Sequence, residues 1–77
     1  MSPAYPKATR PLALAELQRL ATDASSEVRR LTALSLGRVG KAAVAAALAA
    51  LAPMRDDPVE NVRSSARSSY AKLSGAS

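Results

Sequence analysis

The side chains of this 77-residue chain that could carry chemistry are carboxylates and cations, because the sequence contains no His and no Cys. A zinc finger, a thiol nucleophile and a histidine general base are therefore excluded. General acid–base catalysis by carboxylates would need two of them held together. Five of the six acidic residues instead fall at expected turns and helix starts, namely Glu16, Glu27, Asp56, Asp57 and Glu60. We expect no enzymatic activity, no metal and no cofactor.

Cationic side chains outnumber acidic ones by 11 to 6, which gives a net charge of +5. The candidates for partner binding on the second and fourth predicted helices are Arg30, Arg38, Arg63, Arg67 and Lys72. If these helices line one surface, it is basic and suits an acidic protein or nucleic-acid phosphates. Ordinary solvation without a partner is the alternative. The only aromatic residues are two Tyr, so few side chains are available for nucleic-acid bases to stack on. A nucleic acid is therefore a less favoured partner than an acidic protein.

Residues 1–11 have the composition of an extended arm, with three prolines and two basic residues. Tyr5 is held between two of these prolines and is a candidate anchor for a partner. The segment lacks the apolar core of a signal peptide, and the longest low-charge run, 42–52, is too short to span a bilayer. We therefore expect a soluble, cytoplasmic protein, and the Arg-rich and Ala-rich composition favours a bacterial source.

Apolar spacing predicts four helices that form two antiparallel hairpins, hence an all-α fold. The first helix follows Pro11 and ends near Thr22, and the second begins at Ser25 or Ser26. Gly40 would end the second helix, with Gly37 inside it to allow a close approach of another backbone. The third helix runs from Lys41 to just before Pro53. The fourth occupies 59–73, with Gly75 as its stop, which leaves 75–77 as a tail.

The apolar positions also predict which faces are buried. In the second helix we expect Val28, Leu31, Leu34 or Ser35, and Val39 on the core face. In the fourth helix we expect Val62, Ala66, Tyr70 and Leu73 to be buried and the serines, Ser69 included, to be exposed. Tyr70 is then packed in the core or against a cap, and its use as an interface anchor is the alternative.

An internal repeat is the most specific signal in the sequence. Asp23, Val28 and Arg29 recur as Asp57, Val62 and Arg63, each displaced by 34 residues. We match Leu17 and Leu20 to Leu48 and Leu51 at a displacement of 31, with three extra residues in the second inter-helix loop. Helical hairpins that repeat at this period are typical of an α-solenoid.

The first copy, from Asp23 through Val28-Arg29 to Gly37 and Gly40, resembles a HEAT repeat of the phycobilisome-lyase-like bacterial subtype. The second copy is similar, but Ala71 and Ser74 replace the two glycines. The resemblance implies two stacked αα-hairpins, residues 12–40 and 41–74, that bind proteins along their second helices. Iron-dependent hydroxylases of this kind need His–Glu pairs, which this chain lacks.

The repeated Asp and Arg have a structural use of their own. An Asp in the inter-helix turn can accept hydrogen bonds from helix amides, and an Arg six residues later can reach the Asp of its own or the adjacent repeat. An exposed ligand clamp is the alternative.

Two repeats are fewer than the three that solenoids usually need. A cap, a larger partner or end-to-end stacking of two chains would compensate. The sequence therefore predicts a protein-binding adaptor or regulatory subunit, with a phosphate-backbone binder or a self-associating structural module as alternatives.

Overall fold

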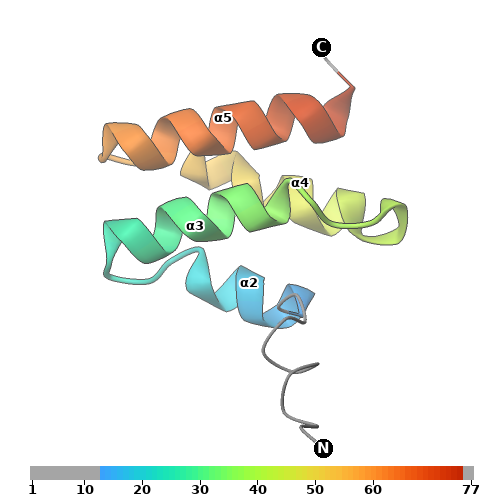
Figure 1. Ribbon diagram of the computed structural model, residues 1–77, viewed down its shortest axis with the longest axis horizontal. Helices are drawn as coiled ribbons and strands as arrows, with labels where there is room; N and C mark the ends of the chain where they lie inside the picture. Colours follow the sequence, from blue (N-terminus) through green and yellow to red (C-terminus); the bar gives the residue numbers. More distant parts are fainter. Residues whose placement is uncertain (1–12, 76–77) are drawn as a thin grey trace, which may run out of the picture.

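The computed structural model describes residues 13–75, which form four α-helices and contain no strand. Helices α2 (Leu14–Leu20) and α3 (Ser26–Leu36) form one antiparallel hairpin, and α4 (Val44–Met54) and α5 (Glu60–Ser74) form the next (Figure 1). A short 3-10 turn, η1 (Lys41–Ala43), precedes α4. The expected all-α fold of two helical hairpins is confirmed. The predicted arm, 1–11, and Tyr5 within it lie outside the described residues.

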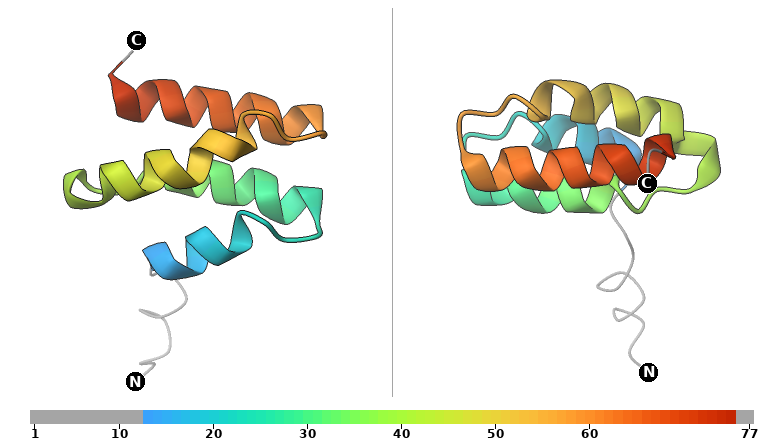
Figure 2. Two further views of the ribbon diagram at one scale, coloured as in Figure 1. Left: turned by 180° about the vertical axis from the view of Figure 1, so that it is seen from behind. Right: turned by 90° about the horizontal axis from the view of Figure 1, so that it is seen from above.

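The helices lie in two layers, with α2 and α4 in one and α3 and α5 in the other (Figure 2). The turn between α2 and α3 and the turn between α4 and α5 lie at the same edge of the stack. Equivalent residues of the two turns are therefore neighbours in space. Among the described residues, no helix is both long enough and apolar enough to cross a membrane.

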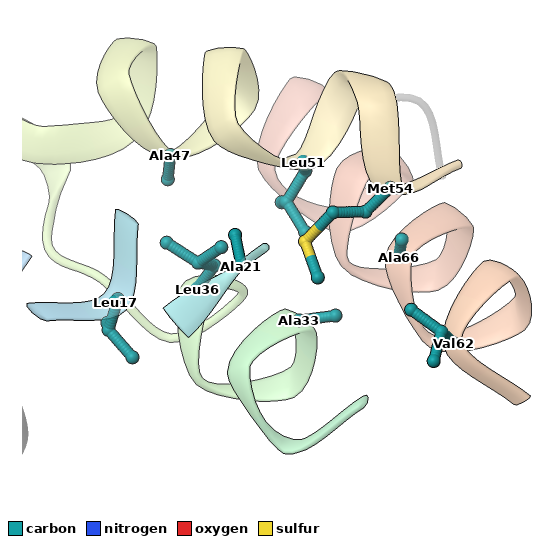
Figure 3. Close-up of a cluster of buried hydrophobic side chains, with 9 residues drawn as sticks. All are labelled: Leu17, Ala21, Ala33, Leu36, Ala47, Leu51, Met54, Val62 and Ala66. Atoms are coloured by element: carbon teal, nitrogen blue, oxygen red, sulfur yellow. The ribbon is translucent and has the colours of Figure 1, made fainter. Parts of the chain in front are cut away.

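The core between the layers is built from small and medium side chains (Figure 3). The largest that are fully buried are Leu36, Leu51 and Val62. Alanines fill much of the remaining space and bring the helix backbones close together. The other buried apolar residues are Leu17, Ala21, Ala33, Ala47, Met54 and Ala66.

The two hairpins share one register of 34 residues around their inter-helix turns. Helices α2 and α4 end at Leu20 and Met54 (54−20), and α3 and α5 begin at Ser26 and Glu60 (60−26). The predicted displacement of 31 for the first helices is wrong, because the two inter-helix turns have equal length. Leucines repeat at every third position of both helices, so the sequence pattern fits either displacement equally well.

Helix α3 buries a different face from the one predicted. Leu31 and Leu34 are 49% and 38% exposed, whereas Thr32, Ala33 and Leu36 are buried. Thr32 is accommodated because its hydroxyl donates to the Val28 carbonyl oxygen at 2.6 Å. The apolar spacing did not reveal this face because a core of closely packed helices accepts Ala and Thr where a larger core needs Leu.

Helix α3 also ends earlier than predicted. Ser25 caps its start, as expected, and accepts a hydrogen bond from the Val28 amide. Its last residue is Leu36, so Gly37 is the C-cap and Gly40 lies beyond the helix. The amide of Gly37 donates to the carbonyls of Ala33 and Leu34, which tightens the final turn.

Gly37 marks a close approach between α3 and α5. A Cβ placed on this residue would lie 2.5 Å from Ser69 Oγ and 2.9 Å from Ser69 Cβ. Ser69 is therefore buried, contrary to our expectation. The absent side chain of Gly37 makes room for a side chain of the facing helix, whereas we expected it to make room for a backbone.

Pro53 lies within α4, whereas the sequence predicted that the helix would end before it. A proline in the last turn removes only one backbone donor. The turn persists because Leu51 and Met54 are buried on either side of it.

We expect Gly37→Ala to lower the free energy of unfolding by about 1–3 kcal/mol, because the new methyl group overlaps Ser69. Gly40→Ala is the matched control, since apart from its chain neighbours no atom of residues 13–75 lies within 4 Å of its Cβ position, and its effect should stay within about 0.5 kcal/mol. Urea unfolding monitored by circular dichroism measures both. Equal stability of the two variants would contradict the close approach.

Candidate functional site

The two inter-helix turns are built in the same way around an Asp. The carboxylate of Asp23 accepts a hydrogen bond from the Ser25 amide at 2.8 Å. The carboxylate of Asp57 accepts one from the Val59 amide at 2.9 Å. Each Asp thus satisfies an amide just before a helix begins, as the repeated sequence predicts.

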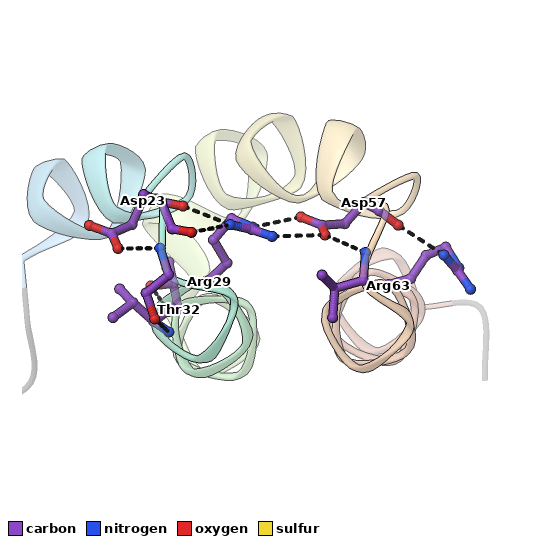
Figure 4. A network of polar contacts seen from close by, with 9 residues as sticks. Asp23, Arg29, Thr32, Asp57 and Arg63 are labelled. Atoms are coloured by element: carbon purple, nitrogen blue, oxygen red, sulfur yellow. Dashed lines mark hydrogen bonds and ion pairs between the residues drawn. The ribbon is translucent and has the colours of Figure 1, made fainter.

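Arg29 joins the two turns (Figure 4). Its Nη1 donates to the backbone carbonyls of Asp23 and Ala24, at 2.8 and 3.2 Å. Its Nε and Nη2 donate to the two carboxylate oxygens of Asp57, at 2.8 and 3.2 Å. The guanidinium therefore holds the turn of its own hairpin and the carboxylate of the next hairpin at once.

This ion pair is mostly removed from water, with the side chains of Arg29 and Asp57 only 15% and 8% exposed. The hydrogen bonds from Arg29 lower the pKa of Asp57, and the amide of Val59 lowers it further, whereas burial acts in the opposite direction. The same pair raises the pKa of Arg29. Both groups stay charged at neutral pH, and bidentate geometry makes the contact directional.

Arg63 occupies the equivalent position on α5. Its Nη1 donates to the backbone carbonyl of Asp57 at 2.9 Å, as Arg29 does to that of Asp23. A row of contacts therefore runs from Asp23 through Arg29 and Asp57 to Arg63.

The predicted cations do not all gather on one surface. Arg30 forms an ion pair with Glu27 one turn away, which raises the pKa of Arg30 and lowers that of Glu27. Arg38 is exposed in the turn after α3. Lys72 lies nine residues after Arg63, about half a turn around α5, so the two point in opposite directions.

Arg67 and Tyr70 lie on the face of α5 that adjoins the end of α4. Arg67 Nε donates to the Arg55 carbonyl at 3.2 Å, and the Arg55 guanidinium carbon lies 3.9 Å from the centroid of the Tyr70 ring. This cation–π contact was missed from the sequence. The register of 34 could have found it, since it places Arg55 and Tyr70 where the first hairpin has the buried Ala21 and Leu36.

An open groove of about 760 Å³ lies between α2 and α4, along the edge that carries the two turns. Alanines and Pro53 form most of its apolar wall. Its polar rim includes Asp23, Arg29 and Asp57, whose hydrogen bonds already hold the turns together. The groove is therefore a mainly apolar hollow, and the polar groups at its rim are already engaged in hydrogen bonds within the protein.

Leu31 and Leu34 are the exposed large apolar side chains of the described residues. They lie one turn apart on α3 and thus form neighbouring apolar area on the outer surface of the α3–α5 layer. Ser65 and Ser68 hold the equivalent positions of α5 (31+34 and 34+34). The fold therefore does not require leucine at either place.

We expect Asp57→Asn to lower the free energy of unfolding by about 2–3 kcal/mol, because it leaves Arg29 charged and partly buried without its counter-ion. Asparagine retains an oxygen for the Val59 amide, so the change isolates the ion pair. Asp23→Asn is the matched control and should cost under about 1 kcal/mol, since Asp23 forms no ion pair within residues 13–75. Similar losses for both variants would contradict the proposed importance of the pair. Chemical denaturation at neutral pH decides between these results.

The same pair predicts a pH dependence. Because folding lowers the pKa of Asp57, its contribution to stability is complete above the ordinary aspartate value of about 4. This contribution is lost as the pH falls from the ordinary aspartate pKa toward the lowered pKa of Asp57 in the folded protein. The difference in unfolding free energy between wild type and Asp57→Asn should therefore shrink from about pH 6 to about pH 2. A constant difference, measured by urea titrations across this range, would show that protonation of Asp57 does not control it.

Comparison with known proteins agrees with the geometry of the two hairpins. A family model of HEAT repeats matches residues 6–71, which is most of the chain. No curated protein and no solved structure matches it. The repeated Asp and Arg, the equal inter-helix turns and most of the two-layered stack lie within the matched region. The chain belongs to the HEAT-repeat family.

Proposed function

We propose that this protein is a non-catalytic binding module for another protein, an adaptor or regulatory subunit. Its partner docks on the outer surface of α3 and α5, around Leu31 and Leu34. The contacting segment of the partner carries apolar side chains flanked by acidic ones. The exposure of these two leucines is the observation that carries the proposal.

HEAT repeats generally mediate protein–protein interactions and are generally non-catalytic. Within this framework, an apolar pair on an otherwise polar surface supports a place for a partner to bury apolar area. The serines on α5 beside it are small and leave the leucines accessible. Arg38 is exposed in the turn that follows α3, and Lys72 holds the position displaced by 34 residues near the end of α5, so exposed cations lie at this end of the layer.

The alternative of a nucleic-acid binder receives less support. Counterion release needs several cations that face one backbone. Arg30 is paired with Glu27, and Arg63 and Lys72 point to opposite sides of α5. The charges that remain near Leu34 suit an acidic protein segment better than a continuous row of phosphates.

The double variant Leu31→Ser, Leu34→Ser tests this surface, because it gives α3 the residues that α5 already has. We expect it to fold normally and to lose at least tenfold in captured partner. The measurement is affinity capture of tagged wild type and variant from a lysate of the source organism, with nuclease, followed by mass spectrometry.

The matched control is Ala45→Ser, Ala49→Ser, which makes two similar changes at exposed positions of α4 in the other layer. This control should retain the partner. Equal recovery of one stoichiometric protein by wild type and both variants would refute the surface. Loss of all captured material after nuclease treatment would refute a protein partner in favour of nucleic acid.

A further inference from the structure

The row of contacts across the two turns has a carboxylate at one end and a guanidinium at the other. At one end, the Asp23 carboxylate bonds the Ser25 amide and forms no ion pair with any residue in 13–75. At the other end, Arg63 uses Nη1 on the Asp57 carbonyl, and its Nε and Nη2 bond no acceptor in the described part of the chain. Figure 4 shows the carboxylate and the guanidinium at opposite ends of the row.

The contact between Arg29 and Asp57 shows how an Arg and an Asp at these repeat positions bind each other. Arg29 is held by its Nη1 on the turn of its own hairpin and thereby presents Nε and Nη2 to the carboxylate of the next. Arg63 is held by one bond of this kind, from Nη1 to the Asp57 carbonyl, and the same two donors, Nε and Nη2, bond no acceptor within the described residues. Because the guanidinium is already positioned, binding a carboxylate loses little conformational entropy.

We propose that copies of this chain associate head to tail, with Arg63 of one copy bound to the carboxylate of Asp23 of the next. This contact repeats the internal pair between Arg29 and Asp57 across the boundary between two molecules. It uses the two ends of the hairpin stack and is independent of partner binding at Leu34.

A second pair of charges supports the same arrangement. Within the chain, Ala21 and Ala50 both line the groove between α2 and α4. The register of 34 places Arg55 at the position of Ala21 (21+34) and Glu16 at the position of Ala50 (50−34). An incoming copy would therefore bring Glu16 toward Arg55, so opposite charges would face each other across a groove that two alanines line inside the molecule.

The interface between copies must be wider than the one between the hairpins. Arg67 stands where Ala33 is buried, and Ala71 stands where Gly37 admits Ser69. These larger side chains prevent the close approach of α3 and α5 from being repeated. We therefore expect a polar, reversible association whose extent grows with concentration. Since each copy offers one end of each kind, the contact is heterologous and can add a third copy.

Reversal of single charges tests the pairing. Arg63→Asp and Asp23→Arg should each remain monomeric, at a mass of 8.0 kDa, because like charges would then meet at every contact. An equimolar mixture of the two variants should regain the association. In the mixture, the aspartate introduced at position 63 of one variant binds the arginine introduced at position 23 of the other, and the unaltered Arg63 binds the unaltered Asp23.

Sedimentation velocity from micromolar to millimolar concentration measures the mass of each sample. Lys72→Asp is the control for net charge, since it makes the same change as Arg63→Asp on the opposite side of α5, and it should still associate. Circular dichroism verifies that each variant is folded.

A wild type that stays monomeric throughout this range would overturn the proposal. It would also be overturned if reversal at either position left the association unchanged, because the copies would then meet through another surface. Failure of the folded single variants to recover on mixing would likewise reject the pairing of Arg63 with Asp23. None of these readouts involves the partner captured at Leu34, so this proposal and the protein-binding function fail separately.

Discussion

The bidentate contact between Arg29 and Asp57 sets how the two hairpins meet. Each of these residues also bonds backbone groups at an inter-helix turn, so the contact orients two turns and two helix starts at once. A pair this well shielded from water is costly unless its geometry is good. Here the guanidinium donors and carboxylate oxygens match one to one, and the surrounding amides and carbonyls satisfy the remaining polar groups.

The small core makes this arrangement necessary. Alanines and one glycine let the helices approach closely, but they bury little apolar area per turn. The hydrogen bonds of Arg29 and Asp57 at the inter-helix turns therefore add to the stability that this small apolar core provides. At the other end of α3, Gly37 has no side chain, and Ser69 of α5 packs into the space that this leaves. Packing and polar contacts thus act at opposite ends of the same pair of helices.

The molecule has unlike surfaces as a consequence of its repeat. One hairpin supplies exposed leucines where the other supplies serines, so the outer layer carries an apolar area at one side only. Likewise, the Arg and Asp that pair in the middle are left without a counterpart at the two ends of the described stack. These differences between equivalent positions are the basis of both proposals.

Much of the fold could be predicted from residues close in sequence. Ser25, Asp23 and Asp57 act within a few positions of themselves, so their roles in the turns were evident from spacing. Gly75 was likewise predictable as a helix stop, and it adopts a positive φ of 79°. The contact from Arg29 to the next hairpin followed from its recurrence at Arg63, although the sequence left two choices of Asp open.

The sequence alone determined the four helices, their turns and the exclusion of histidine and cysteine chemistry, because these depend on composition and local hydrogen bonding. Only the tertiary structure decided which face of α3 is buried, the register of α2 against α4, and the stacking of Arg55 on Tyr70. Each of these depends on groups brought together from different helices. When alanine can pack on nearly every side, the pattern of apolar residues does not specify which side faces the core.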